Sequence, residues 1–343
     1  MEIIEDLTTE NKEQKNILIG TIGTSWITES FISAIAGVKN LSLSAVYSRN
    51  SQKAKAFAEK HHAEKYYSDM EAMAQDPSID AIYIASPNFL HHTQTMQFLK
   101  AGKHVICEKP LASDYQEAKE MIETARENHV ILLEAMRTAY DPGLSVIRDN
   151  LHKLGKIRRV SFWYGKYSSK YDAFLSGKPQ NIFSLECSAG ALMDMGVYCV
   201  YPMVDLFGMP EKILADCVKL HNGIDGTGTV VMNYGEMLAE ISYSKISDSR
   251  LASEIQGEQG TMVIPEIASP SDLKIFYRNG KVEELYTRDC PNNMIYEAEM
   301  FVKAILGQED ITYYQEKSLE SLKLMDEIRR QDGIVFPADG KEL

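Results

Sequence analysis

The chain has 343 residues and a formal net charge of −13 at neutral pH, with 36 lysines and arginines against 49 aspartates and glutamates. No basic stripe accompanies this acidic balance, which argues against nucleic acid or an anionic membrane as a partner. The length exceeds what one hydrophobic core usually organises, so we expect two domains.

The cysteines and the N-terminal segment bear on the cellular compartment. The five cysteines are odd in number and scattered, with no CxxC motif and no metal-ligand spacing, a pattern typical of reduced thiols in a cytoplasmic protein. Residues 1–15 are acidic and polar, without an apolar run behind a basic head. We therefore expect a flexible tail there, with no signal peptide and no membrane anchor.

The first strand and helix enclose a candidate phosphate site. Residues 17–19 predict a strand, and apolar residues at three- and four-residue steps over 27–35 predict a helix. A glycine turn before a helix N-terminus makes an anion site, because backbone N–H groups and the helix dipole point toward it. In the motif G-x-G-x-x-G, Gly23 would hold the first place, Ser25 the second and Thr28 the third. The motif is therefore eroded, and a purely structural turn stays open as an alternative.

A second strand, over residues 41–47, ends where a dinucleotide fold reads the adenosine ribose. An NAD site would carry Asp or Glu there to accept from the 2′-hydroxyl. This chain carries Ser48 and Arg49, with Lys53 one turn further on. Their charge suits a 2′-phosphate, so we expect NADP in preference to NAD; the alternative is a solvated basic start of a helix.

The alternation of strands and helices continues to residue 137. Further strands are expected at residues 65–67, 79–85, 104–107 and 130–135, with helices at 51–62, 68–75, 93–101 and one opened by a capping box of Ser113 and Gln116. Strands separated by helices predict an α/β domain over residues 16–137, with the doubly wound parallel sheet of a Rossmann fold. His91 and His92 point apart on a helix and lack a ligand-type residue three or four positions away, so we expect no metal site.

The strand at residues 104–107 ends in a carboxylate, a lysine and a proline. Pro110 cannot extend the ladder, and it holds Lys109 in an extended conformation at the strand's carboxyl end. Ligands bind at that edge of an open α/β sheet. A solvated ion pair between Glu108 and Lys109 is the alternative interpretation.

The second half of the chain changes to mostly antiparallel strands. After a helix at residues 143–153, strands are expected at 157–164, 213–220, 227–234, 237–244, 252–257, 261–264, 273–277 and 282–286. The dipeptide Asn279-Gly280 predicts a hairpin with a type I′ turn. Helices near 190–207, 292–306 and 318–330 would cover one face of an open sheet in an α+β domain over 138–343. The uncovered face predicts a homodimer or homotetramer, unless charged edge residues leave it solvated.

A carboxylate and a phenol lie four residues apart within the first of those helices. In a helix this spacing puts Asp194 and Tyr198 on the same side. The pair is a candidate for acid/base chemistry, although a buried tyrosine with an aspartate partner is commonly just a satisfied core hydroxyl.

These motifs together resemble one family. Glu108-Lys109-Pro110 after the fifth strand, Ser86-Pro87-Asn88-x-x-His91 after the fourth, and Asp194-x-x-x-Tyr198 in a glycine-flanked helix look like the pattern of the Gfo/Idh/MocA oxidoreductases. The resemblance runs from about Lys15 to the closing segment 328–337, which is similar to the dihydrodiol-dehydrogenase-like branch.

The resemblance implies an NAD(P)-dependent dehydrogenase that acts on a sugar, a cyclitol or a dihydrodiol, with its active site between the domains. Lys109 would bond the reacting oxygen, Tyr198 would be the general acid/base, and Asp194 would orient the pair. The pyrophosphate turn would be lined by Gly23, Thr24, Ser25, Trp26 and Ile27. The nicotinamide ribose would be flanked by Ser86, Pro87, Asn88, His91 and Glu108. Tyr stands where many members of the family carry His.

Residue chemistry adds further expectations. A free phenol is nearly all protonated at neutral pH, and we expect Lys109 and the positive nicotinamide ring to lower the pKa of Tyr198. Arg137, Tyr140, Tyr164 and Lys166 would line the substrate pocket, although surface packing explains them as well. Two other functions stay open: a catalytically silent, nucleotide-sensing regulatory protein of the same fold, and a reductase of an aldehyde or imine.

Overall fold

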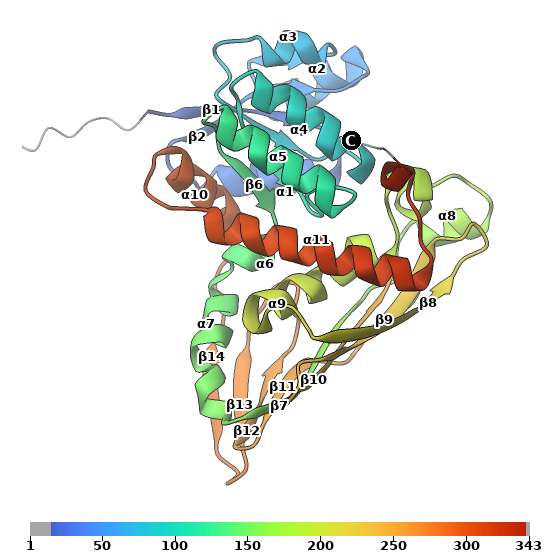
Figure 1. Ribbon diagram of the computed structural model, residues 1–343. Helices are drawn as coiled ribbons and strands as arrows, with labels where there is room; N and C mark the ends of the chain where they lie inside the picture. The colour runs from blue at the N-terminus through green and yellow to red at the C-terminus, as the bar shows by residue number, and fades with distance from the viewer. Residues whose placement is uncertain (1–14, 341–343) are drawn as a thin grey trace, which may run out of the picture.

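The first half of the chain forms one parallel sheet in the computed structural model, which describes residues 15–340 (Figure 1). The strand order is β3-β2-β1-β4-β5-β6, and every neighbouring pair is parallel. The strands are β1 (Ile17–Ile22), β2 (Leu41–Tyr47), β3 (Lys65–Tyr67), β4 (Ala81–Ile84), β5 (His104–Glu108) and β6 (Leu132–Ala135). The order reverses between β1 and β4, as in a doubly wound fold, so the predicted Rossmann sheet is confirmed.

Helices alternate with these strands, which explains why the central strands are apolar along their whole length. They are α1 (Trp26–Ile35), α2 (Ser51–Lys60), α3 (Met70–Ala74), α4 (His91–Lys100) and α5 (Tyr115–Glu127). Of the predicted tail, residues 1–14 lie outside the described residues. Lys15 is described, and its Nζ lies 2.5 Å from Asp80 Oδ1.

Several predicted boundaries were wrong for local reasons. The predicted capping box fails because Asp114, not Ser113, is the N-cap of α5: its carboxylate accepts from the N–H of Glu117 at 2.8 Å. The helix predicted over 68–75 is shorter, because Asp69 caps it and starts it at residue 70. The helix predicted over 318–330 instead begins at Thr312, where the Asp310 carboxylate accepts from the Thr312 N–H at 2.9 Å.

The second half forms an eight-stranded sheet in the order β14-β13-β12-β11-β7-β10-β9-β8. Its strands are β7 (Ile157–Gly165), β8 (Lys212–Lys219), β9 (Asp225–Asn233), β10 (Leu238–Ser244), β11 (Ser253–Gly257), β12 (Gly260–Ile264), β13 (Leu273–Tyr277) and β14 (Val282–Tyr286). All neighbours are antiparallel except β7 and β10, which are parallel. This parallel pair brings the carboxyl ends of β7 and β10 to the same edge of the sheet.

The predicted type I′ turn at Asn279-Gly280 is wrong, although the hairpin itself is present. Gly280 takes a φ of +85°, whereas Asn279 keeps a negative φ. The Gly280 N–H bonds the Tyr277 carbonyl at 3.0 Å and the Tyr277 N–H bonds the Lys281 carbonyl at 2.9 Å. This is a three-residue loop closed by a left-handed glycine, so one extra residue separates the strands.

The remaining α-helices come after β6 in the chain. They are α6 (Arg137–Tyr140), α7 (Pro142–Asn150), α8 (Tyr171–Leu175), α9 (Val197–Phe207), α10 (Met294–Ile305) and α11 (Thr312–Asp332). Our predicted helix ran to residue 153, but residues 151–154 form a 3-10 turn. Figure 1 shows α11 running between the first sheet's helices and the second sheet, and it contacts α5, α9 and β8. One apolar cluster therefore contains residues of both halves, among them Met121 of α5, Val204 of α9 and Met325 of α11. Within residues 15–340, no helix combines the length and the apolar character that a membrane crossing requires.

Candidate active site

The turn after β1 fits a dinucleotide phosphate. Gly23 has a φ of +108°, and a Cβ placed on it would lie 2.8 Å from the backbone oxygen of Ala85, so only glycine suits this position. Ser25 is the N-cap of α1 in an extended conformation and makes no side-chain cap, which leaves first-turn N–H groups for an anion. Thr28 is buried, and its hydroxyl has no partner among the described residues. Small side chains thus keep the cradle that the eroded glycine motif predicts.

Other predicted residues of this turn differ in exposure. Trp26, the first residue of α1, is 74% exposed beside the turn. Thr24 and Ile27 are half-buried, so the three residues flank the cradle without closing it.

The basic side chains after β2 are unpaired within residues 15–340. Arg49 and Lys53 are exposed, and neither side chain has an ion-pair or hydrogen-bond partner within residues 15–340. The side chain of Asn50 caps α2 by accepting from the Lys53 N–H at 3.0 Å, while the Ser48 N–H donates to the Tyr67 carbonyl. The local geometry leaves both cations available to a phosphate.

The Ser86-Pro87-Asn88-x-x-His91 segment mainly braces the site. The two ring nitrogens of His91, a fully buried side chain, lie 2.9 Å from the carbonyl oxygens of Pro110 and Ser86, so the ring joins the turns after β4 and β5. Asn88 donates to the Ser188 carbonyl at 2.8 Å and thereby joins the first half to the second. The hydroxyl of Ser86 is buried without a partner in the described part of the chain, so it is free for a ligand.

Glu108 points into the interior. Its carboxylate accepts from the Tyr83 hydroxyl at 2.6 Å and from the Lys109 N–H at 3.3 Å. Burial raises the pKa of Glu108, although Tyr83 and Lys109 oppose that shift. The ion pair of Glu108 with Lys109, which was our alternative interpretation, is not formed, because the lysine ammonium bonds the Asp194 carboxylate instead.

Lys109 reaches across to the second half of the chain. Its Nζ lies 2.9 Å from both Asp194 Oδ1 and the Asp194 backbone oxygen, and the Lys109–Pro110 peptide bond is cis. Burial lowers the pKa of Lys109, but Asp194, Tyr198 and Glu108 together outweigh burial and raise the pKa above its ordinary value. The two contacts use two of the three ammonium donors, and one remains for a substrate oxygen.

A second lysine that we did not predict shares the same carboxylate. The Nζ of Lys245 lies 2.9 Å from Asp194 Oδ2, and this side chain has no exposed surface. Burial raises the pKa of Asp194, but Lys109 and then Lys245 outweigh it and hold the pKa well below the usual range. Lys245 follows β10 directly, so a lysine at the end of a buried strand was the available sequence signal.

Asp194 lies in a π-helical turn, Leu192–Gly196, rather than in the α-helix we predicted. Gly190 precedes the turn with a φ of +121°, and the Asp225 carboxylate accepts from the Leu192 N–H at 2.6 Å. Single π turns inside helices are frequent at functional sites. Here the turn presents Asp194 to Lys109 while Tyr198 follows in α9.

Tyr198 is buried among cations and a second phenol. The Lys109 ammonium lies 4.8 Å from its ring centre and the Arg137 guanidinium carbon 5.3 Å from it. The ring of Tyr164 meets it edge-on with centres 5.3 Å apart. The Tyr198 hydroxyl has no hydrogen-bond partner among residues 15–340, so it is free to bond a ligand.

The pKa we expected for Tyr198 needs correction. Lys109 and Arg137 do lower it, as predicted for Lys109, but burial of the phenol outweighs both and raises the pKa above its ordinary value. Burial also raises the pKa of Tyr164 to about 12. Both phenols are therefore protonated at neutral pH.

Two predicted pocket residues lie elsewhere. Tyr140 donates its hydroxyl to the Glu134 backbone oxygen at 3.0 Å and packs against Tyr314 with ring centres 4.9 Å apart. Lys166 is exposed and its backbone N–H bonds Ser244. Packing thus explains Tyr140, while Arg137 and Tyr164 are the predicted pocket residues that border Tyr198.

Glu297 is a buried carboxyl group near the site that we did not predict. Glu297 of α10 has no exposed surface, and both its carboxyl oxygens lack a partner among the described residues. Burial raises its pKa far above the ordinary value, with Glu108 adding to the shift. Periodicity places Glu297 inside α10 but does not show what it faces.

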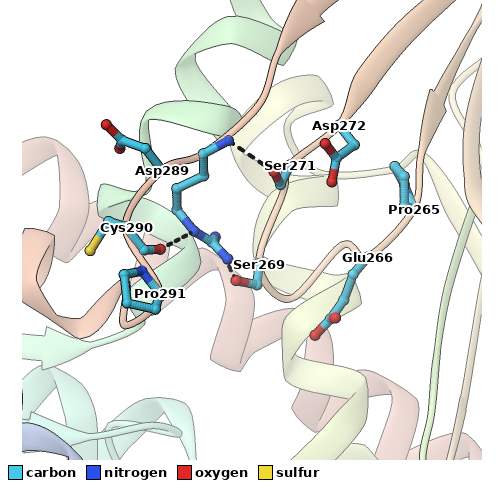
Figure 2. A pocket seen from close by; sticks show the side chains of 9 residues that line it. Pro265, Glu266, Ser269, Ser271, Asp272, Asp289, Cys290 and Pro291 are labelled. Carbon is cyan, nitrogen blue, oxygen red and sulfur yellow. Dashed lines mark hydrogen bonds between the residues drawn. The ribbon is translucent and has the colours of Figure 1, made fainter.

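The cavity in Figure 2 is separate from this cluster. It has a volume of about 370 Å³ and lies between residues 265–272 and 288–291. The Arg288 guanidinium bonds the Cys290 carbonyl at 2.8 Å, the Ser269 hydroxyl at 2.7 Å and the buried Asp141 carboxylate at 2.8 Å. Arg288 therefore fixes both loops to the N-cap of α7, and neither Lys109 nor Tyr198 lines this cavity. Within residues 15–340, no group of three His, Cys, Asp or Glu side chains could hold a metal ion.

Two family models match the chain. The model of the oxidoreductase family with an NAD-binding Rossmann fold matches residues 17–136, and the model of the GFO/IDH/MocA C-terminal domain matches residues 150–263.

Curated relatives match over nearly the whole length. The chain is 46% identical to scyllo-inositol 2-dehydrogenase (NADP(+)) IolU of Bacillus subtilis (strain 168), over 94% of this chain and 99% of that protein. It is 43% identical to the uncharacterized oxidoreductase YgjR of Escherichia coli (strain K12), over 95% and 100%. It is 31% identical to trans-1,2-dihydrobenzene-1,2-diol dehydrogenase of Danio rerio, over 87% and 90%.

A solved structure shares the fold. KijD10, a 3-ketoreductase from Actinomadura kijaniata in complex with NADP and TDP-benzene, matches with a TM-score of 0.83 at 22% identity, over 93% of this chain and 98% of that chain.

Proposed function

The chain belongs to the GFO/IDH/MocA family of NAD(P)-dependent oxidoreductases, and on this basis we propose that it transfers hydride between NADP and a hydroxyl-bearing carbon of a cyclitol, sugar or related polyol. The observation that carries the proposal is the meeting of Lys109, just after β5, and Tyr198, in α9, whose ammonium and ring centre are 4.8 Å apart although they come from different halves of the chain. A free ammonium donor and a free phenol at one place can serve a single alcohol oxygen.

Each residue has a separate task. Hydride leaves a carbinol carbon only as the hydroxyl proton is taken up, so a proton acceptor must reach that oxygen. Tyr198 accepts this proton in alcohol oxidation and donates it in carbonyl reduction. Lys109 stabilises negative charge on the oxygen, and Asp194 holds Lys109 in place through two contacts of 2.9 Å. When bound, the nicotinamide supplies or accepts the hydride.

At neutral pH the protonated state of Tyr198 favours carbonyl reduction over alcohol oxidation. Because burial raises the pKa of Tyr198, its phenol is ready to donate a proton to a carbonyl. Alcohol oxidation needs the phenolate, and its rate rises toward alkaline pH.

NADP is the preferred cofactor in this proposal, with NAD as the alternative. The cradle at Gly23 and the open N-terminus of α1 would take the pyrophosphate. Arg49 and Lys53 would take the 2′-phosphate, because both are exposed cations without another partner in the described chain. The name of the 46% identical relative, which states NADP, supports this choice.

The substrate is proposed to be a cyclitol first and a dihydrodiol second, in the order of identity to the named relatives. Arg137 and Tyr164 border Tyr198, and they offer a guanidinium and a phenol to further hydroxyl groups of a polyol. A single-hydroxyl substrate would leave these groups without partners.

A spectrophotometric assay tests the proposal. Purified chain is mixed with NADP or NAD and with scyllo-inositol, myo-inositol, glucose or a trans-dihydrodiol, and the reduced-nicotinamide absorbance is followed. We expect turnover of a polyol with NADP, and a loss of roughly 100- to 10,000-fold in Tyr198→Phe. Cofactor binding without turnover of any of these substrates would instead favour a nucleotide-sensing regulatory protein.

We further propose that the enzyme is cytoplasmic and has two domains, residues 16–137 and 138–343. We also propose that it forms a homodimer or homotetramer through the second sheet. The outer face of this sheet carries the apolar side chains of Leu214, Val218 and Leu238, which are 62%, 57% and 54% exposed. The free cysteines suit a reducing compartment. Light scattering of the wild type and of Leu214→Lys tests the assembly. A charge on the face that is buried between subunits should dissociate the oligomer.

A further inference from the structure

Lys245 is a buried ammonium group that the proposed mechanism does not use. Its side chain has no exposed surface, and its Nζ lies 2.9 Å from Asp194 Oδ2. It also donates to the Ile182 carbonyl at 2.9 Å and lies 5.0 Å from the ring centre of Phe183. Burying a lysine ammonium costs free energy of folding unless the charge is paired. A functional role beside the site would explain why the chain carries this lysine.

The topology of the second sheet places this lysine. β7 and β10 pair in parallel, with Tyr164 opposite Tyr243 and Gly165 opposite Ser244. Lys245 therefore leaves its strand at the same edge as Tyr164, whose ring contacts Tyr198.

The two lysines occupy the two oxygens of one carboxylate. Lys109 bonds Asp194 Oδ1 and Lys245 bonds Asp194 Oδ2, each at 2.9 Å. The three groups together carry a single net positive charge, whereas Lys109 and Asp194 alone would carry none. Lys245 thereby offsets the carboxylate that holds Lys109.

We propose that Lys245 is a positioning residue: it keeps Asp194 shared between two ammonium groups, so that the positive charge of Lys109 stays effective at Tyr198. This inference rests on the proposed function for its catalytic meaning. Lys245 acts through Asp194 and does not itself touch the reacting oxygen.

The groups facing Tyr198 set the sign of the effect. Lys109 and Arg137 favour the phenolate, Glu108 and Asp194 oppose it, and the neighbouring phenol of Tyr164 stays neutral at working pH. Removing Lys245 leaves Asp194 compensated by Lys109 alone, so phenolate becomes harder to form. Removing the Asp194 charge has the opposite sign, because two ammonium groups then remain.

The test compares Lys245→Met with Asp194→Asn. The pH dependence of kcat for alcohol oxidation is measured with saturating NADP, and NADP affinity is measured by quenching of tryptophan emission. We expect the rising limb of this pH profile to shift to higher pH by roughly one unit in Lys245→Met, which is about a tenfold lower rate at a fixed pH on that limb, and to shift to lower pH in Asp194→Asn. NADP affinity should change less than twofold in Lys245→Met.

A merely structural Lys245, one that ties residues 182–183 to the sheet, would lower kcat without moving the limb, and that result would overturn the proposal. So would limbs that move in the same direction in both variants. If Lys245→Met does not fold, Lys245→Gln removes the charge while keeping a donor for the Ile182 carbonyl, and the same shift is expected.

A second measurement does not depend on turnover. Ionisation of Tyr198 is read as the phenolate absorbance of a protein minus that of the same protein with Tyr198→Phe, with circular dichroism checking the fold at each pH. Lys245→Met should raise the pH at which this difference appears, and Asp194→Asn should lower it. Unchanged titration would reject the role of Lys245 even if a substrate were turned over, whereas shifted titration without any turnover would reject only the proposed function.

Discussion

Replacing Lys109 by methionine tests the centre of the site. Methionine keeps much of the length and apolar character of the lysine stem, so the substitution removes mainly the ammonium. In the wild type this ammonium makes two hydrogen bonds of 2.9 Å to Asp194 and has only 11% of its side chain exposed. Asp194 keeps a cationic partner in the variant, because Lys245 still bonds its other oxygen. Collapse of the fold is therefore not expected.

The size of the effect follows from the donors that are lost. Of the three N–H donors of Lys109, two hold Asp194 and one is left for the substrate oxygen. Loss of one preorganised donor to a developing oxyanion costs about 3 kcal/mol in the transition state, which lowers kcat roughly 100- to 1,000-fold. NADP affinity should stay within a few-fold, since the pyrophosphate cradle lies at Gly23.

The assay measures kcat and KM for the polyol that the wild type turns over fastest, at saturating NADP. NADP affinity is measured separately by quenching of tryptophan emission. A matched control is Lys166→Met, which removes an exposed lysine that has no side-chain partner in residues 15–340. An Lys109→Met variant with kcat within threefold of wild type would refute the role given to this ammonium. A variant that loses NADP binding to the same degree as turnover would place Lys109 in cofactor binding instead.

Three further outcomes are expected. Gly23→Ala should cost about 1–3 kcal/mol of stability and weaken NADP binding more than tenfold, because its φ is +108° and the new Cβ would meet Ala85 O at 2.8 Å; unchanged affinity would exclude this turn as the cofactor site. Arg49→Asp should lower NADP affinity roughly 10- to 100-fold and leave NAD affinity equal or better, and equal losses for both cofactors would count against a 2′-phosphate contact. Burial raises the pKa of Glu134 from 4.5 to about 7, so the folded chain retains a proton that the unfolded chain releases between these values. The free energy of unfolding of the wild type should thus fall relative to Glu134→Gln as pH rises from about 4.5 to about 7, and urea titrations that run parallel across this range would contradict the assignment.

The parallel sheet could be predicted because its signals are local. Buried parallel strands appear as continuous apolar runs, and Gly23, Pro110 and the caps mark where each one ends. The position of Lys109 follows from the same logic, since a proline after a strand fixes the preceding residue at the sheet's carboxyl edge.

The parts that escaped prediction depend on distant contacts. Lys245 joins the site only because β10 pairs in parallel with β7, a pairing that hairpin rules do not suggest. The π turn at Asp194 depends on Gly190 and on a hydrogen bond that the Leu192 N–H donates to the Asp225 carboxylate at the start of β9. Likewise, the raised pKa of Tyr198 reflects burial by residues from both halves, which no window of sequence contains.

The course of α11 limits how this protein can be dissected. Because that helix packs on α5 from one half and on α9 and β8 from the other, a fragment ending at residue 137 would expose the apolar surface of α5 to water. The complementary fragment would carry α11 with its α5-facing side bare. Neither piece should be obtainable as a well-behaved separate product, and a truncation before Thr312 should compromise both sheets at once.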